Sequence, residues 1–311
     1  MTRAECAKFL RRADNFLLIT HQRPDGDSLG SASALCMALR DLGKTAYLYP
    51  NPEVTEKHRV YAEPLFPPET GFSPECAVAV DVASENQFPV GFDGAVALCV
   101  DHHGSNTLYA GNTYLESKSS CGEVVYALIR EMGAPIDRDM ANVLYIAVST
   151  DTGCFCFANT NADTLRTAAD LVSLGAENGA LNKRYFRTFS AARIALEGKI
   201  YSGLRRFRDG KINIAVITLA MMAETGVTED DMEDIAALPG RVAGSVVSAT
   251  IREVQIGRCK VSLRSMPEVD ANAICQKFGG GGHRAAAGCT IDAGPEESCA
   301  LLLREMEAAV V

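Results

Sequence analysis

The chain has 311 residues, of which 47% are hydrophobic, and this length exceeds a usual single core and suggests two domains. Its formal net charge of −9 disfavours binding to long nucleic acids, because that affinity rests largely on neutralising many phosphates. No signal-type apolar segment follows the N-terminus, and no run of about 20 apolar residues exists to span a bilayer. We therefore expect a cytoplasmic protein without membrane association.

The first predicted strand, residues 16–20, is an apolar run that ends at a group of polar side chains. His21, Asp25 and Asp27 follow within seven residues, at the carboxyl end of the strand, where open α/β sheets place their sites. A proline and a glycine in this loop sharpen the turn, so the two aspartates need not point in opposite directions and can serve two different ions. Apolar residues at helical spacing then predict a helix that ends at Gly43.

Three further apolar runs are predicted as strands, and each leads to an acidic residue. The runs 77–80, 96–100 and 144–150 lead to Asp81, to Asp101 with His102 and His103, and to Asp151, respectively. A single acidic residue after a strand is usually a helix cap or a turn residue. Four acidic strand ends, two of which carry histidines, instead favour a metal centre.

Residues outside these motifs are predicted to be structural. The 11 cysteines are odd in number and scattered through apolar segments, which predicts reduced, buried thiols rather than disulfides. Cys154 and Cys156 have the wrong spacing for a zinc site, and their alternation indicates a strand with both on one face. His58 stands alone among charged residues, which predicts a solvated surface side chain.

The second half of the chain predicts a smaller α/β lobe. A basic, helical stretch within residues 180–208 lacks the earlier pattern of apolar strands that end in acidic residues, and we interpret it as the connection between domains. Its basic side chains either form a solvated helix face or line the cleft and attract phosphates. After it we expect a strand at 211–218, an acidic helix at 228–237 capped by Thr228, and a strand at 259–265.

Four consecutive glycines at 279–282 precede His283 and Arg284. Glycines adopt backbone dihedrals that are closed to other residues, and they let N–H groups approach an anion without an intervening side chain. The adjacent basic residues favour an anion-binding loop over one that is merely flexible.

Taken in order, these motifs resemble the DHH family of phosphoesterases. The matching segments are His21-Gln-Arg-Pro-Asp25-Gly-Asp27-Ser-Leu-Gly30-Ser31, Asp81, Asp101-His102-His103 and Thr150-Asp151-Thr-Gly153. The Gly-Gly-Gly-His run ending at His283, and the strand Ser262-Leu-Arg264-Ser265, resemble the DHH-associated C-terminal domain, so the resemblance covers nearly the whole chain.

The resemblance implies an α/β fold in which a doubly wound, mostly parallel N-terminal sheet domain precedes a smaller C-terminal α/β domain, with the active site in the cleft between them. The expected boundaries are 1–186 for the catalytic domain, 187–208 for a connector helix and 209–311 for the substrate-binding domain.

Within the family, the glycine-histidine run separates this chain from family II pyrophosphatases, and the absence of an added nucleic-acid-binding module separates it from the single-strand exonucleases. The remaining group hydrolyses short oligoribonucleotides to mononucleotides (nanoRNase activity) and dephosphorylates adenosine 3′,5′-bisphosphate. Two alternatives remain open: a phosphodiesterase for cyclic or linear dinucleotides such as cyclic di-AMP or pApA, and a non-catalytic nucleotide sensor.

The resemblance also implies roles for individual residues. The ligands of one metal ion are His21, Asp25 and Asp81, and those of the other are Asp27, Asp81, His102 and Asp151. The catalytic residues are Asp81, Asp101 and His103, of which His103 faces the scissile phosphate and Asp101 orients a neighbour. The substrate-binding residues are His103, Arg264, Gly280, Gly281, Gly282 and His283.

The expected cofactor is a pair of Mn²⁺ ions per subunit, because mixed imidazole and carboxylate ligands favour Mn²⁺ over Mg²⁺, with Co²⁺ or Mg²⁺ as alternatives. The expected partners are short single-stranded RNA or nucleotides rather than long duplexes or membranes, and formation of a homodimer is left open.

Overall fold

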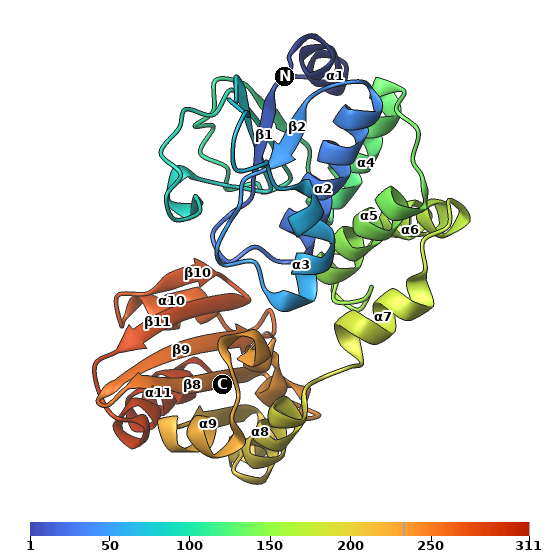
Figure 1. The fold of residues 1–311 in the computed structure, drawn as a ribbon. Coiled ribbons are helices and arrows are strands. Elements are labelled where there is room, and N and C mark those ends of the chain that lie inside the picture. Colours follow the sequence, from blue (N-terminus) through green and yellow to red (C-terminus); the bar gives the residue numbers. More distant parts are fainter. Residues whose placement is uncertain (233, 311) are drawn as a thin grey trace. The chain divides into compact units, whose positions relative to one another are not determined.

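The structure is a computed structural model that describes residues 1–232 and 234–310, and the chain divides into two compact units between Thr188 and Phe189 (Figure 1). The first unit contains a five-stranded sheet and the second a six-stranded sheet. The α/β class expected from the sequence, with a parallel N-terminal sheet and a smaller C-terminal α/β part, is confirmed.

The sheet of the first unit has the strand order β2-β1-β3-β4-β5, and all its neighbouring strands are parallel. Its strands are β1 (Phe16–Ile19), β2 (Ala46–Leu48), β3 (Cys76–Val80), β4 (Leu98–Asp101) and β5 (Thr113–Leu115). The chain moves outward from β1 in both directions, so the strand order reverses between β1 and β3. Ligands of open α/β sheets bind at the carboxyl ends of the strands at such a point.

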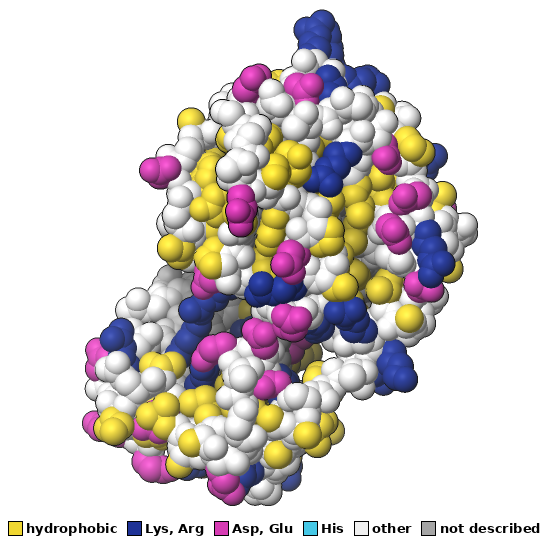
Figure 2. Space-filling model, viewed as in Figure 1, with side chains coloured by type: hydrophobic (Ala, Val, Ile, Leu, Met, Phe, Trp, Pro, Cys, Tyr) yellow, Lys and Arg dark blue, Asp and Glu magenta, His cyan; other side chains and the backbone are white. Residues whose placement is uncertain are grey.

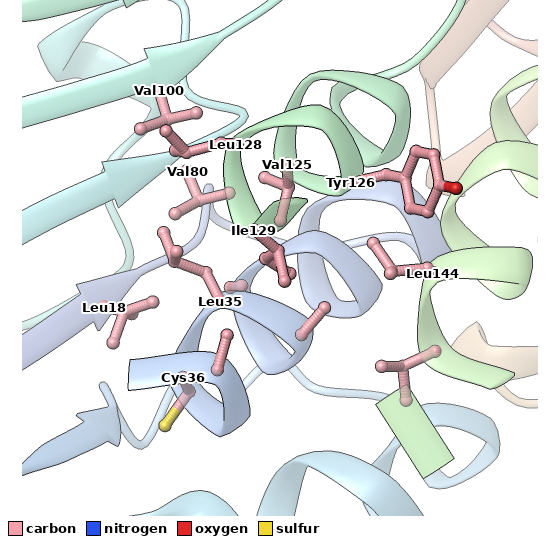
Figure 3. Close-up of a cluster of buried hydrophobic side chains, with 14 of the residues drawn as sticks. Leu18, Leu35, Cys36, Val80, Val100, Val125, Tyr126, Leu128, Ile129 and Leu144 are labelled. Carbon is pink, nitrogen blue, oxygen red and sulfur yellow. The ribbon is translucent and has the colours of Figure 1, made fainter. Parts of the chain in front are cut away.

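Helices cover one face of this sheet and bury the larger core. The helices of the unit are α1 (Arg3–Arg12), α2 (Gly26–Asp41), α3 (Glu56–Ala62), α4 (Cys121–Met132), α5 (Arg138–Asp151), α6 (Ala162–Ser173) and α7 (Asn178–Phe186), with short 3₁₀ segments η1 (Glu63–Leu65) and η2 (Glu85–Gln87). Figure 3 shows Leu18 and Val80 of the sheet packed against Leu35 of α2 and Ile129 of α4. A smaller cluster on the opposite face joins Ile19 and other strand residues to aromatic side chains of the following loops.

The prediction of a strand at residues 144–150 is wrong, because these residues belong to the helix α5. Leu144 to Val148 are all nearly fully buried, so an apolar run without visible periodicity is equally compatible with a buried helix. The overlooked signal was Asp137, whose side chain accepts a hydrogen bond from the Met140 amide at 2.9 Å and caps the helix. Asp151 therefore lies at the last residue of a helix and not after a strand.

The mixed sheet of the second unit has the order β10-β11-β9-β8-β7-β6, in which only β7 and β8 run parallel. Its strands are β6 (Arg205–Phe207), β7 (Ile212–Ile217), β8 (Val247–Gln255), β9 (Arg258–Ser265), β10 (Gly281–His283) and β11 (Ala286–Ile291), and its helical segments are α8 (Ala191–Ser202), η3 (Arg208–Gly210), α9 (Leu219–Thr225), η4 (Glu229–Met232), η5 (Ile235–Arg241), α10 (Ala271–Gln276) and α11 (Pro295–Ala309). Ile212 and Ile214 face one core, and Ile217 faces the other, so both faces of the sheet are covered. α8 lies in the range expected as a connector, and its Leu196 and Ile200 are buried in the second of these cores.

The prediction of an acidic helix at residues 228–237 is wrong, because the described part of this range contributes to the 3₁₀ segments η4 and η5. Residue 233 lies outside the described residues. The backbone amide and the hydroxyl of Thr228 both donate to the Asp231 carboxylate, at 2.9 and 3.2 Å. Thr228 is thus a donor in a local turn rather than the acceptor that a helix cap requires.

The glycine run forms a β-hairpin instead of an open loop. Gly281 to His283 pair with Ala286 to Gly288 in antiparallel register. Gly282 has a φ of +147°, and a Cβ there would lie 2.6 Å from the Ala286 carbonyl oxygen, so this position requires glycine.

Two predictions for single residues are also corrected. His58 is only 1% exposed, its Nδ1 lies 2.7 Å from the Tyr61 hydroxyl, and its ring stacks on Tyr185, so it is not a solvated side chain. Cys154 lies in a turn of left-handed residues rather than a strand. The cysteines are free and all but Cys154 and Cys156 are buried, as expected. Among the described residues, none of the helices is long and apolar enough to cross a bilayer.

Candidate metal centre

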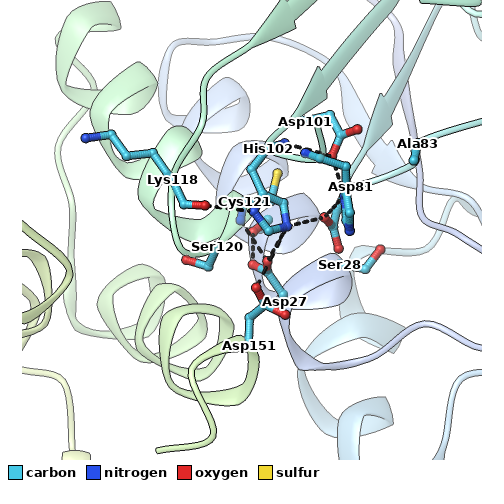
Figure 4. A network of polar contacts seen from close by, with 12 residues as sticks. Asp27, Ser28, Asp81, Ala83, Asp101, His102, Lys118, Ser120, Cys121 and Asp151 are labelled. Atoms are coloured by element: carbon cyan, nitrogen blue, oxygen red, sulfur yellow. Dashed lines mark hydrogen bonds and ion pairs between the residues drawn. The ribbon is translucent and has the colours of Figure 1, made fainter. Parts of the chain in front are cut away.

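Eight acidic and imidazole side chains of the first unit converge near the carboxyl ends of β1, β3 and β4. Figure 4 shows Asp27, Asp81, Asp101, His102 and Asp151 among them. They fall into three overlapping groups whose ligand atoms lie within 4.8 Å of one another. These groups are His21 with Asp25 and Asp81; Asp27 with His102 and Asp151; and Asp81 with Asp101, His102 and His103. The fold thus brings together all six residues expected as metal ligands.

Asp81 occupies the centre of this arrangement. Its Oδ2 lies 3.9 Å from His21 Nε2, and its Oδ1 lies 3.5 Å from His102 Nε2. These separations exceed those of hydrogen bonds, so space remains between the facing ligand atoms. Asp81 Oδ1 is buried without a hydrogen-bond partner, and an unsatisfied buried carboxylate oxygen fits a position that a cation fills.

Two of the three histidines in these groups, His21 and His102, are oriented by backbone carbonyls. His102 Nδ1 lies 3.1 Å from the Lys118 carbonyl oxygen, and His21 Nδ1 lies 2.7 Å from that of Gln22. A carbonyl oxygen can only accept a hydrogen bond, so Nδ1 carries a hydrogen in both rings, and in the neutral form Nε2 presents its lone pair. His102 Nε2 is directed at Asp27 and Asp151, both at 3.8 Å, which is the tautomer that metal ligation requires.

Asp27 is held by the N-terminus of α4. Its carboxylate accepts hydrogen bonds from the Cys121 amide at 2.7 Å, the Gly122 amide at 2.8 Å and the Ser31 hydroxyl at 3.0 Å. The positive end of a helix stabilises an anion placed there. This support was not identified from the sequence, although Ser120, followed three residues later by a glutamate, is a pattern typical of a helix start.

Asp101 is saturated by hydrogen bonds and orients its neighbours. Its Oδ1 accepts from the His102 amide at 2.7 Å and from His103 Nδ1 at 2.8 Å, and its Oδ2 accepts from Asn106 Nδ2 at 2.6 Å. Fully buried and engaged in this way, Asp101 fixes the His103 ring, whose Nε2 is the nitrogen left for another partner. Asn106 was not identified from the sequence, because a single loop asparagine carries no pattern.

A second overlooked asparagine connects two ligand-bearing segments. Asn159 Nδ2 donates to the Asp151 carbonyl oxygen at 3.1 Å and to the Ser119 carbonyl oxygen at 3.0 Å. Ser119 directly follows Lys118, whose carbonyl orients His102. Asn159 therefore links the backbone at Asp151 to the segment that fixes the His102 tautomer.

Two glycines of α2 allow it to approach α5 closely. A Cβ at Gly26 would lie 2.6 Å from the Thr150 side chain, and one at Gly30 would lie 2.4 Å from the Val143 carbonyl oxygen. Real Cβ atoms do not come so close to other heavy atoms, so both positions need glycine. This contact brings the start of α2, with Asp27, next to the end of α5, with Asp151.

The crowded carboxylates resist ionisation in the metal-free chain. Burial, followed by the charge of Asp25, raises the pKa of Asp81 to about 8, and burial with the charges of Asp81 and Asp151 raises that of Asp27 well above its usual value. Burial opposes the charge on His21, but its contacts with Asp25 and Asp81 prevail and raise its pKa to about 9. Bound cations would relieve this repulsion, and the mixed imidazole and carboxylate donors fit divalent metal ions.

The candidate substrate residues of the second unit lie in one row across its sheet. His283 of β10 pairs with Ala286 of β11, which in turn pairs with Arg264 of β9. Residues directly opposite one another in a sheet share a face, so the imidazole and the guanidinium lie on the same face, separated by the small Ala286. Gly280 to Gly282 lead into this row, and a Cβ at Gly280 would lie 2.2 Å from the Gly288 carbonyl oxygen.

Comparison with protein families identifies two domains. Residues 15–148 match the DHH family, N-terminal domain, and residues 194–311 match the DHHA1 domain. The chain is 35% identical over 283 residues to the bifunctional oligoribonuclease and PAP phosphatase NrnA of Thermus thermophilus, covering 88% of this chain and 83% of that protein. It is 25% identical to the Bacillus subtilis protein of the same name, over 93% of each chain. Among solved structures, an exopolyphosphatase-related protein from Bacteroides fragilis superposes with a TM-score of 0.83 at 22% identity, covering 98% of this chain and 95% of that one.

Proposed function

The chain belongs to the DHH family of phosphoesterases, and we propose that it hydrolyses short oligoribonucleotides to mononucleotides and dephosphorylates adenosine 3′,5′-bisphosphate. As a family member it is a hydrolase of phosphoric esters. The observation that carries the proposal is the convergence on Asp81 of two imidazole-carboxylate groups, in a chain 35% identical to an oligoribonuclease and PAP phosphatase.

The proposed ligands divide into two sets that share Asp81. His21, Asp25 and Asp81 would hold one divalent ion, and Asp27, Asp81, His102 and Asp151 the other. Mn²⁺ is the proposed metal, because imidazole nitrogens are poorer ligands for Mg²⁺, which prefers oxygen ligands and retains its waters. When bound, such ions supply a water of lowered pKa and neutralise charge on a phosphoryl group.

His103 is proposed to contact the scissile phosphate. Its hydrogen bond to Asp101, despite burial, raises the pKa of His103 to about 9 in the metal-free chain. Asp101 holds the proton on Nδ1, and Nε2–H is then free to donate to a phosphate oxygen. Asp101 acts in this account by orienting His103 and not by binding metal.

Arg264 and His283 are proposed to bind the other phosphates of the substrate, with the backbone of Gly280, Gly281 and Gly282 beside them. Their common row on one sheet face allows both side chains to contact one short, anionic ligand. The groups that Arg264 and His283 would bind are anions, which suits a guanidinium and an imidazole.

Short substrates are favoured over long ones by the charge of the chain. A protein with a net charge of −9 gains little from additional phosphates outside its site. On the face of the first unit that Figure 2 shows, acidic and basic side chains are interspersed and do not form a continuous basic track.

The direct test is release of AMP from pApA and of phosphate from adenosine 3′,5′-bisphosphate, in Mn²⁺ and after its removal by a chelator. We expect metal-dependent turnover of both by the wild-type chain and its loss in Asp81→Asn, which removes the shared carboxylate charge at nearly constant volume. Turnover that persists in Asp81→Asn would contradict the assignment of Asp81, and absence of wild-type turnover with metal bound would contradict the activity.

A further inference from the structure

A polar pocket adjoins the metal centre on the side of His21. It has a volume of about 290 Å³ and is lined by His21, Gln22, Arg23, Glu53, Gln87 and Val90. A larger cavity of about 390 Å³ lies between α4 and α6, but none of the candidate metal ligands lines it. The smaller pocket shares a residue with the metal centre, so a ligand in it would lie next to the reacting group.

The pocket is formed by loops that hydrogen bonds hold in place. The Gln22 amide donates to the Gln87 carbonyl oxygen at 2.6 Å, which joins the loop after β1 to η2. Asn51, only 3% exposed, donates from Nδ2 to the His21 carbonyl oxygen at 3.0 Å and accepts from the Glu53 amide at 2.9 Å. The wall that carries Glu53 is thus connected to a candidate metal ligand through one buried side chain.

Arg23 adopts a backbone conformation that is uncommon for a residue with a side chain. Its φ is +48°, and its amide and its Nε both donate to the Glu53 carboxylate, each at 3.3 Å. Such conformations cost free energy and persist where surrounding contacts enforce them, often at ligand-binding sites. Here the contacts that enforce it also shape the wall of the pocket.

The charges of the lining favour a neutral group over a phosphate. Arg23 and Glu53 form an ion pair, so a phosphate in the pocket would meet the Glu53 carboxylate as well as the guanidinium. The remaining lining combines the polar side chains of Gln22 and Gln87 with the apolar Val90, which is 69% exposed. Gln87 Oε1 already accepts from the Ala83 and Ser84 amides, at 2.8 and 3.3 Å, so Gln87 would offer its Nε2 donor to a ligand. This donor and the Gln22 side-chain amide, beside an apolar surface, suit the hydroxyl groups of a ribose and the edge of a base.

We infer that this pocket binds the nucleoside attached to the phosphate that is hydrolysed, and that its lining determines base preference. Sites for drug-sized ligands have volumes of about 300–1,000 Å³, so a pocket of about 290 Å³, just below this range, suits one nucleoside rather than a dinucleotide. The inference rests on the proposed function, because it assumes that a nucleotide phosphate occupies the metal centre.

The test fills the pocket without altering any candidate ligand. In Val90→Trp we expect the KM for pApA to rise by about tenfold or more, with kcat nearly unchanged, because a large ring occupies space that the nucleoside needs. Mn²⁺ affinity, measured by calorimetry, should equal that of the wild type. Val172→Trp, at a partly exposed valine of α6 outside the pocket, is the matched control and should leave both quantities unchanged.

A second variant tests selectivity. Glu53→Gln keeps the size of the side chain but removes its charge, and it should change the ratio of kcat/KM among pApA, pGpG, pCpC and pUpU by about threefold or more. An unchanged KM in Val90→Trp with unchanged ratios in Glu53→Gln would overturn the inference. So would a fall in Mn²⁺ affinity as large as the rise in KM, since the effect would then act through His21.

Binding of AMP to the Mn²⁺-loaded protein separates this inference from the proposed function. Even if no dinucleotide is hydrolysed, we expect AMP to bind the wild type, and its Kd for Val90→Trp to be higher by about tenfold or more. Equal AMP affinity in the two chains would overturn the pocket assignment, whatever the activity.

Discussion

Asp81 shows how much of the centre a single residue determines. Its position after β3 places one carboxylate oxygen toward His21 and the other toward His102, and both separations leave room for a cation. The candidate ligands could be identified from the sequence, because they stand in dense, ordered motifs, and the fold brings them together. Asn106 and Asn159 were not, because an isolated polar residue shows its role only once the fold has placed it beside its partners.

Asn159→Ala is expected to weaken metal binding without unfolding the chain. Its amide connects the Asp151 backbone to Ser119, and loss of comparable outer contacts weakens metal affinity about 10- to 100-fold. Calorimetric Mn²⁺ titration measures the effect, and saturating Mn²⁺ should restore kcat. Asn112→Ala, which removes one exposed hydrogen bond to the Ala97 carbonyl, is the control. Unchanged Mn²⁺ affinity in Asn159→Ala would show that the link has no positioning role.

Arg264→Ala and His283→Ala are expected to raise the KM for pApA by about tenfold or more while leaving the bound metal unchanged. Both side chains lie on one sheet face of the second unit, and neither belongs to the candidate metal-ligand groups. Steady-state kinetics with metal analysis of the same samples checks this. A loss of metal that parallels the loss of activity would contradict their assignment as substrate residues.

At the scale of elements, the contact of α2 with α5 sets the distance between Asp27 and Asp151. The strands β1, β3 and β4 and the helix α2 were predictable from apolar runs, helical spacing and the terminal Gly43. α5 was not, because its central residues, Leu144 to Val148, are all buried, so that this part of the helix has no polar face and no visible period. The hairpin β10–β11 was also missed, since its pairing depends on the register with β9 rather than on local sequence.

Gly30→Ala is expected to destabilise the fold by about 1–3 kcal/mol and to weaken Mn²⁺ binding, because the added methyl group would lie 2.4 Å from the Val143 carbonyl oxygen and force α2 away from α5. Gly198→Ala in α8 is the matched control, since nothing lies within 4 Å of its Cβ position. That control should be neutral or stabilising by up to about 1 kcal/mol. Urea unfolding gives both values, and equal effects of the two substitutions would refute the close-packing argument.

At the scale of the whole molecule, the crowded charges link metal binding to stability. Two units and an acidic, α/β chain were evident from length, composition and motif order, but the electrostatic state of the centre was not. It depends on burial and on distances between groups that are remote in sequence, such as Asp27 and Asp151. A chain that concentrates carboxylates in this way is expected to be most stable when cations are bound.

The metal-free chain is expected to lose stability as the pH rises from about 5.5 to about 8.5. The pKa of Asp81 is raised from 3.8 to about 8 and that of His21 from 6.5 to about 9, so over this range the folded state binds more protons than the unfolded state. The stability that protonated Asp81 and His21 contribute to the folded state is therefore lost as these groups release their protons. Burial opposes the charge on Asp25, but His21 lowers the pKa of Asp25 to about 2. Asp25 is therefore ionised throughout this pH range and does not contribute to the pH dependence of stability.

Thermal unfolding with a chelator and with Mn²⁺ measures this dependence. The decline should be steeper without metal, because bound cations keep the carboxylates ionised in the folded state at every pH tested. Stability that rises with pH in the metal-free chain, or the same slope with and without Mn²⁺, would contradict this description of the centre.

The measurement that tests the central claim most directly is turnover of a substrate panel with Mn²⁺, using Asp81→Ala as the inactive control. The panel comprises pApA, a tetranucleotide, an RNA of about 24 nucleotides, adenosine 3′,5′-bisphosphate, cyclic di-AMP and pyrophosphate. The account predicts mononucleotides from the short RNAs and phosphate from the bisphosphate, with little turnover of the long RNA. Preferential turnover of cyclic di-AMP or pyrophosphate would contradict the proposed substrate class, and no turnover with metal bound would contradict catalysis itself.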